Sequence, residues 1–187
     1  MARLTVGSAL PPRDLAAVSG EKVPIPDPRL QVHLQLRRFA GCPICNLHLR
    51  TFVTRRDELQ AAGVREVIVF HSPADELRPY ASEFPFALIP DPDRRLYSEL
   101  GVEASPRALL DPRAFPGILR AVVSTTLGVL LGRERAPALL PHGGRLGLPA
   151  DFLISPGGRV LSCKYGQHAD DQWSVDELLA RAAESGH

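Results

Sequence analysis

The sequence predicts an α/β fold, and three observations support this class. Short β-branched runs alternate with helix-length amphipathic segments through the first half of the chain, which is typical of parallel βαβ units. Two strand-like runs joined by a Ser-Pro-Gly-Gly turn then predict an antiparallel hairpin near the C-terminus. With 187 residues, 44% of them hydrophobic, the chain is long enough to bury a full core without disulfide support. We therefore expect one domain over residues 1–187, with a mixed central sheet.

The first strand of this sheet is predicted after a Pro-rich segment. Residues 1–31 show no sustained periodicity, and we expect an irregular lead-in there. From 32 to 39 the residues alternate in character and place Val32, Leu34 and Leu36 on one face. This period of two predicts a half-buried strand.

A helix is predicted directly after this strand. Pro43 suits the first position of a helix, because its missing N–H has no helical partner there and its φ is already helical. Cys42 then falls at the N-cap, and Gly63 marks the end of a helix over residues 44–62. The remaining elements are expected as a strand at 66–70, a helix at 73–83, a strand at 86–89, a helix at 92–100, hairpin strands at 151–154 and 159–164, and a helix at 174–184 opened by a capping box at 174–177.

Residues 103–147 interrupt this rhythm and form a predicted insertion. Within it, residues 114–132 are apolar except for Arg120. The length is compatible with a membrane span, but interior Pro, Gly, Ser and Thr residues favour a buried or interface helix. We expect no membrane span.

The charge balance excludes one class of partner. The chain has 22 Lys and Arg against 21 Asp and Glu, a net charge of +1. Proteins that bind by neutralising phosphates carry a concentrated basic excess, so we expect no nucleic-acid partner. A secretory signal is not evident, and three cysteines are too few for a disulfide scaffold. We expect a cytoplasmic protein without cofactor or metal.

Two of the cysteines carry the main chemical signal. Cys42-Pro43-Ile44-Cys45 is a C-x-x-C motif, and its sulfurs share one helix face at a spacing that permits a disulfide. A thiolate at the N-cap faces unpaired N–H groups and the positive end of the helix dipole, which lowers its pKa. We expect Cys42 to be the acidic, exposed thiolate and Cys45 its partner. Of Arg37 and Arg38, which point to opposite faces of the strand, at most one can assist.

Two other interpretations of the motif stay open. His48 extends it to C-x2-C-x2-H, which is half of a zinc site, although a second cysteine pair is missing from the sequence. The cysteines can also be purely structural. Haem attachment is excluded, because it needs His directly after Cys45 and Asn46 stands there.

The chain resembles the thioredoxin fold, and more narrowly the peroxiredoxin-like branch of the AhpC/TSA superfamily. The resemblance rests on RRFAGCPICNLHLR (37–50), DPDRRLYSELGV (91–102) and LPADFLISPGGRVL (148–161). It implies a three-layer α/β/α fold with a helical insertion before the last two strands. It also implies that Cys42 and Cys45 are redox-active and that Pro149 matches a cis-proline beside the dithiol. Cys42 replaces the Thr of the peroxiredoxin loop, so the thioredoxin and peroxiredoxin patterns nominate Cys42 and Cys45, respectively, as the attacking residue.

Topology nominates further neighbours of the dithiol. His71 follows the strand at 66–70, at the carboxyl edge where parallel sheets place their ligands. The last strand returns toward the same edge and brings His168 and Asp170 with it. Each of these residues also has a plain structural interpretation as a loop or strand-end polar group.

The motif and the resemblance together predict a thiol-dependent oxidoreductase. In this hypothesis Cys42 and Cys45 alternate between dithiol and disulfide while reducing a peroxide or a protein disulfide. An external thiol reductant, such as a thioredoxin system, restores the dithiol. The alternative is a non-catalytic redox-sensing or interaction module, with the apolar insertion as a dimer or partner surface.

Overall fold

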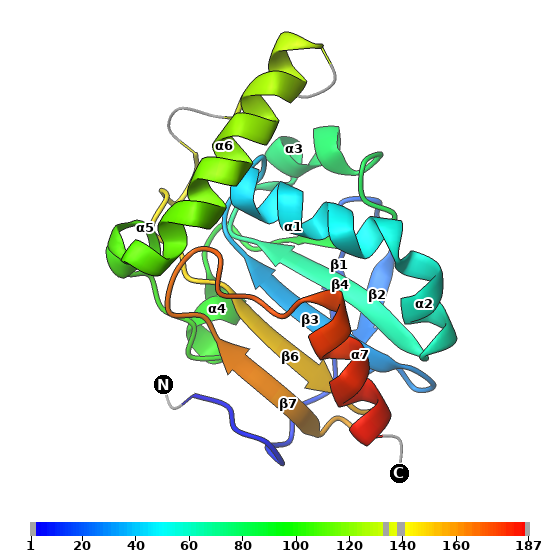
Figure 1. Ribbon diagram of the computed structural model, residues 1–187. Helices are drawn as coiled ribbons and strands as arrows, with labels where there is room; N and C mark the ends of the chain where they lie inside the picture. The colour runs from blue at the N-terminus through cyan, green and yellow to red at the C-terminus, as the bar shows by residue number, and fades with distance from the viewer. Residues whose placement is uncertain (1–2, 133–134, 138–140, 186–187) are drawn as a thin grey trace.

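The computed structural model describes residues 3–132, 135–137 and 141–185, and its centre is a five-stranded mixed sheet (Figure 1). The strand order is β5-β4-β3-β6-β7. The strands are β3 (Gln31–Arg37), β4 (Val64–Phe70), β5 (Ala87–Pro90), β6 (Ala150–Ile154) and β7 (Val160–Tyr165). Strands β3, β4 and β5 are parallel, whereas β6 pairs antiparallel with both β3 and β7. The predicted α/β class, mixed sheet and terminal hairpin are confirmed.

Helices cover one face of the sheet, and a helix with a small hairpin covers the other. On the first face lie α1 (Pro43–Thr54), α2 (Arg56–Ala61) and α7 (Val175–Glu184), which cross in front of the strands in Figure 1. On the second face, α4 (Arg95–Glu99) and the strands β1 (Arg13–Ala16) and β2 (Lys22–Ile25) share a hydrophobic cluster with the sheet. The layers match the thioredoxin-like arrangement that the resemblance implied.

The predicted irregular lead-in over residues 1–31 is wrong in its middle. Strands β1 and β2 form an antiparallel pair in which Asp14 faces Pro24. A two-stranded sheet tolerates a proline, because the missing N–H can face away from the partner strand. Proline content therefore suggested irregular structure where the chain forms an edge hairpin.

Two predicted helices are divided in the structure. The helix expected over residues 44–62 breaks at Arg55 (φ −109°, ψ 23°), where α1 ends and α2 begins. The helix expected over 73–83 is reduced to α3 (Ala74–Leu77) and a 3-10 turn (Arg78–Tyr80). Pro79 lies in that turn, and a proline cannot donate the backbone hydrogen bond that a longer helix needs. By contrast, the capping box that opens α7 is present as expected, with Ser174 and Glu177 bonded reciprocally.

The insertion forms α5 (Arg107–Leu110), a 3-10 turn (Pro112–Ala114) and α6 (Phe115–Leu130), while residues 133–134 and 138–140 lie outside the described part. Helix α6 packs against α1 and then extends beyond the body of the molecule (Figure 1). None of the helices in the described ranges combines the length and apolar character that crossing a bilayer requires.

Candidate active site

The dithiol lies where the chain turns from β3 into α1. Cys42 is the N-cap of α1 and Pro43 is its first residue, as the sequence predicts. The turn depends on Gly41, which has φ 74° and whose missing Cβ would overlap the Tyr80 hydroxyl. The backbone N–H of Ala40 donates to Ser72 Oγ at 3.0 Å, which ties this turn to the end of β4.

Both sulfurs are buried, which corrects the expectation of an exposed thiolate. Cys42 and Cys45 are each 0% exposed, and both are free thiols in the structure. Their hydrophobic cluster includes Ala121 of α6 and Ala169 of the loop after β7. The insertion and this loop therefore help to enclose a motif that would otherwise lie at an open helix end.

The two cysteines differ in acidity as expected. Burial by itself would raise the pKa of the Cys42 thiol. The Cys45 thiol and the Arg38 guanidinium oppose this by stabilising the thiolate, as do backbone N–H groups at the start of α1, and the pKa of Cys42 falls to about 6. Burial and the facing Cys42 raise the pKa of Cys45 well above its ordinary value. Near neutral pH the pair is one thiolate beside one thiol.

Arg38 is the cation of this site, and Arg37 is not. Arg38 Nη1 lies 3.6 Å from Cys42 Sγ, and Nη2 of the same guanidinium donates to the Arg145 carbonyl. Arg37 leaves the strand on the other face and binds Asp151 at 2.6 Å. The two arginines therefore diverge as the strand alternation predicted.

Replacing Arg38 with methionine is expected to shift the thiolate transition of Cys42 from about 6 toward higher pH, because the opposing cation is lost while burial remains. The pH dependence of thiolate absorbance in the ultraviolet, or of alkylation by iodoacetamide, measures the shift. Arg13→Met, which removes a partly buried arginine paired with Glu99, is the control and should leave the transition in place. An unchanged transition in Arg38→Met would contradict the assigned role.

His71 is buried at the carboxyl end of β4, next to Arg38 rather than bonded to a sulfur. Its backbone N–H donates to the Arg38 carbonyl at 3.1 Å. Nδ1 lies 3.2 Å from the His142 carbonyl, which can only accept, so Nδ1 carries the proton. Burial, together with the charges of Arg94 and Arg38, lowers the pKa of His71 to about 4. The imidazole is therefore neutral near pH 7.

Pro149 occupies its predicted place before β6, but not with the predicted isomer. In the described part of the chain the cis peptide bond is Ile25–Pro26, and Leu148–Pro149 is trans. Pro149 is buried against Gly166, and its carbonyl accepts from the Gly166 N–H at 2.9 Å. The Pro149 segment thus continues the β6-β7 pairing, a tertiary contact that the local sequence does not specify.

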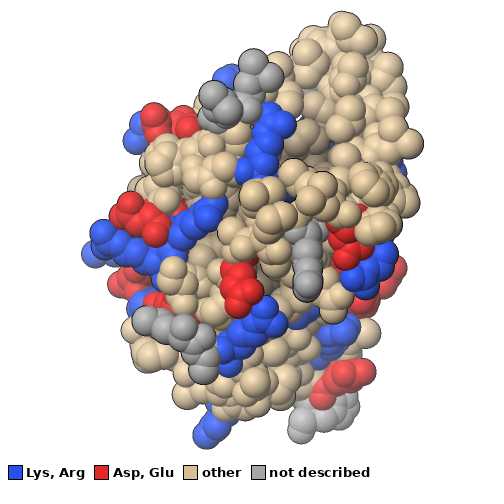
Figure 2. All heavy atoms as spheres, turned by 90° about the vertical axis from the view of Figure 1, so that its left-hand side faces the viewer, with Lys and Arg blue, Asp and Glu red and all other residues tan. Residues whose placement is uncertain are grey.

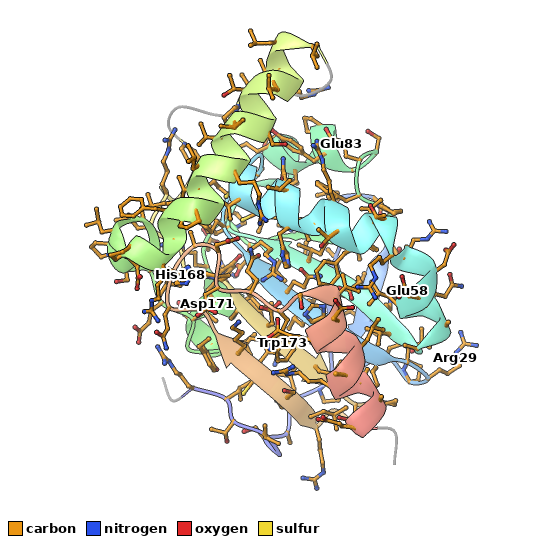
Figure 3. All side chains as sticks on the ribbon, in the orientation of Figure 1. Arg29, Glu58, Glu83, His168, Asp171 and Trp173 are labelled. Atoms are coloured by element: carbon orange, nitrogen blue, oxygen red, sulfur yellow. The ribbon has the colours of Figure 1, made fainter. Side chains whose placement is uncertain are left out.

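The loop after β7 brings His168 and Asp170 toward the insertion. Figure 3 shows His168 and Asp171 in this loop, beside the start of α6. The Asp170 N–H donates to His168 Nδ1 at 3.3 Å, and the Ala169 N–H donates to the Ala108 carbonyl at 2.9 Å. The Asp170 carboxylate packs so close to Gly117 that a Cβ there would overlap it. Loop and insertion are therefore packed together as one cover.

Asp170 also lines a pocket of 320 Å³ between α1 and α6. Ile44, which separates the two cysteines, contributes to its wall, as do His48 and Arg120. Burial raises the pKa of Asp170, and burial lowers that of His48 well below its ordinary value. A pocket of this size, adjacent to the motif and lined by both apolar and polar side chains, can hold a small molecule. Because Ile44 belongs to the motif, Cys42, Pro43 and Cys45 lie in the same region as His48 and Asp170, and His71 contacts the backbone of Arg38.

Sequence reasoning missed a buried ionic network beneath α1. His33 Nδ1 lies 2.8 Å from Glu66, and His33 Nε2 lies 3.1 Å from Asp151. Arg37 binds the same Asp151 oxygen, and Gln35 bonds to both Arg37 and Glu66. Burial opposes protonation, but the two carboxylates raise the pKa of His33 to about 9. The sequence signal for this network was the alternation of polar residues in β3. We expected that polar face to be solvated, but β3 is a central strand and is covered on both faces.

Comparison with known proteins identifies the family. The profile of the AhpC/TSA antioxidant enzyme family matches residues 51–168, which is more than half of the chain. The chain belongs to this family. The matched range begins beyond Cys45, so membership rests on the body of the fold and not on the C-x-x-C motif. Comparison with curated proteins gives no match to this chain.

Solved structures of low sequence identity share the fold of this AhpC/TSA family member. Peroxidoxin BcpB from Mycobacterium tuberculosis is 14% identical with a TM-score of 0.68, covering 97% of this chain and 98% of that one. A cysteine-to-serine mutant of PrxQ from Xylella fastidiosa is 12% identical with a TM-score of 0.70, covering 100% of both chains. A candidate thiol:disulfide interchange protein DsbE from Chlorobium tepidum is 18% identical with a TM-score of 0.59, covering 96% of this chain and 99% of that one.

Among the described residues, no group of three or more His, Cys, Asp or Glu side chains could hold a metal ion.

Proposed function

We propose that this AhpC/TSA family member is a thiol peroxidase in which Cys42 attacks the peroxide and Cys45 resolves the product. The observation that carries the proposal is a fully buried Cys42 held as a thiolate by Arg38. A protein disulfide must bring its own sulfur into line with the attacking one, which needs an open surface around Cys42. A hydroperoxide is small enough to reach an enclosed sulfur. Burial thus favours peroxide over protein disulfide as the substrate.

The chemistry follows from the unequal acidity of the two sulfurs. The Cys42 thiolate attacks one oxygen of the hydroperoxide, an S–O bond forms and the O–O bond breaks, and the leaving oxygen takes a proton to become water or an alcohol. Arg38 stabilises the anionic charge as it moves from sulfur to oxygen. The Cys45 sulfur then displaces water from the Cys42 sulfenic acid and forms the Cys42–Cys45 disulfide. The two cysteines supply the two electrons.

An external dithiol must return those electrons before another turnover. A thioredoxin-type reductant can do so by exchange at the disulfide, which requires α6 or the loop after β7 to move away from the buried sulfurs. A cytoplasmic setting, where thiol pools are kept reduced, suits such a cycle. The neutral His71, the trans Pro149 and the loop residues His168 and Asp170 then shape the surroundings of the dithiol.

The test compares substrates on the fully reduced protein. Hydrogen peroxide or cumene hydroperoxide is expected to convert Cys42 and Cys45 into a disulfide, detected by mass spectrometry, much faster than it modifies Cys163. Cys163 is an internal standard because burial raises its pKa and it lies on β7. With thioredoxin, thioredoxin reductase and NADPH, peroxide should be consumed in turnover. In a separate assay without thioredoxin, which itself reduces insulin, the protein should not accelerate the reduction of insulin disulfides by dithiothreitol.

Each other result supports a different function. Insulin reduction without peroxide consumption would contradict the peroxidase and support thiol-disulfide exchange. A Cys42–Cys45 disulfide that forms and is reduced without turnover of either substrate would support the redox-sensing module. Peroxide that modifies Cys42 no faster than Cys163 would remove the basis for an activated thiolate.

A further inference from the structure

Helix α6 exposes most of its large apolar residues to solvent instead of packing them against its own domain. The fully buried residues of α6 are small, namely Gly117, Ala121 and Gly128, and Ile118 is half-buried against the cluster that contains the cysteines. Most of the large apolar residues instead face solvent and form what we call the α6 stripe, with exposed fractions of 50% to 77%: Phe115, Leu119, Val122, Val123, Leu127, Leu130 and Leu131. A helix on a globular surface ordinarily turns such a face inward. The inverted pattern indicates that something covers the α6 stripe.

The α6 stripe is continuous, uncharged and prominent. Its members recur at helical spacing along one side of α6, and Thr126, also exposed, lies among them. Arg120 is the single charged residue of α6 and flanks the stripe rather than interrupting it. In Figure 2 the uppermost part of the molecule, where the end of α6 rises, carries neither blue nor red side chains.

We propose that the α6 stripe is the contact surface for a second copy of this chain, with the two α6 helices packed antiparallel about a twofold axis. Such an interface brings each residue near the axis opposite its own copy, where charged residues would repel each other. Val123 lies midway along the stripe, so it would face itself. An uncharged stripe meets this requirement without any complementary partner.

The area of the stripe also fits a dimer. Burying a large apolar side chain contributes about 1.5–3 kcal/mol, which at about 25 cal/mol per Å² corresponds to roughly 60–120 Å² of apolar surface. When each side chain of the stripe is weighted by its exposed fraction, the exposed apolar area is on the order of 400 Å². A standard interface buries about 800 Å² per partner, of which a little over half is apolar. The stripe supplies about the apolar share of such an interface, and neighbouring polar residues would form its rim.

The composition of α6 argues against a lipid surface as the occupant. Helices that lie on membranes carry several Lys and Arg residues on their polar face to meet lipid headgroups. Helix α6 has only Arg120, and its other side is taken by α1. Covering the stripe with a second copy would also hold α6 against α1, beside the buried dithiol.

The test is sedimentation velocity of the full chain from low to high micromolar concentration. Wild type is expected to be a dimer, and Val123→Glu is expected to raise the dissociation constant by at least about tenfold, because like charges meet at the axis. Val123→Lys should weaken the dimer in the same way, and an equimolar mixture of the two variants should restore it. Val6→Glu is the matched control, since Val6 is 65% exposed but lies outside α6 and should leave the dimer intact.

Three results would overturn the proposal. A wild type that stays monomeric at the highest concentration would exclude self-association. A dimer that Val123→Glu and Val123→Lys both leave intact would place the interface elsewhere. A monomer that pellets with phosphatidylcholine vesicles would assign the stripe to a lipid surface. The readout is mass, so it is independent of whether the peroxidase proposal holds.

Discussion

Replacing Cys42 with serine is expected to abolish peroxide turnover, with a loss on the order of 10³-fold or more. A serine hydroxyl stays protonated where the Cys42 thiol, with a pKa of about 6, is already a thiolate. Cys45→Ser should behave differently, because the attacking sulfur remains while the resolving sulfur is gone. It should consume one peroxide per chain and stop as a Cys42 sulfenic acid, about 16 Da heavier. Stopped-flow peroxide consumption and intact mass measure the two outcomes.

The third cysteine supplies the matched control for this pair. Cys163 is half-buried on β7, where its thiol donates to the Leu4 carbonyl at 3.6 Å, and it takes no part in the proposed steps. Cys163→Ser should retain full turnover. If instead Cys45→Ser lost the first step and Cys42→Ser kept it, the attacking and resolving roles would be reversed, as the peroxiredoxin pattern of the sequence suggests.

Replacing Asp151 with alanine should lower the free energy of unfolding by about 3–5 kcal/mol, the usual cost of removing one partner from a buried ion pair. Asp151 is 0% exposed and accepts from both Arg37 and His33, so its loss leaves two buried cations without their shared carboxylate. Burial opposes ionisation of Asp151, but Arg37 and His33 hold its pKa well below the ordinary value. Urea unfolding at neutral pH, followed by circular dichroism, measures the change.

An ion pair on the surface with the same N–O distance shows how much of the effect comes from burial. Asp176 lies 2.6 Å from Arg55, the same distance as between Asp151 and Arg37, but its side chain is 82% exposed. Asp176→Ala is expected to leave stability nearly unchanged, because solvent screens an exposed pair. Similar losses in the two variants would show that the buried network contributes no more than a surface contact.

The sequence predicted the parts of the fold that depend on local pattern. The alternation in β3, the proline at the start of α1 and the capping box of α7 each depend on residues within a few positions, and each is found where expected. Two predictions failed in segments that contain proline, because its effect depends on the surrounding structure. Residues 13–25 form a hairpin despite Pro24 and the prolines that flank them, and Pro79 shortens the helix expected over 73–83.

For the candidate site, the local sequence is enough to predict that Cys42 is a helix N-cap one turn from Cys45, and that this position favours a thiolate. The burial of both sulfurs, the choice of Arg38 over Arg37 as the neighbour of Cys42, and the covering of the polar face of β3 become visible only in the folded chain. The difference follows from distance along the chain. Acidity at a helix start comes from adjacent peptide groups, whereas burial comes from α6 and the loop after β7, which are brought over the dithiol by packing that local periodicity does not encode.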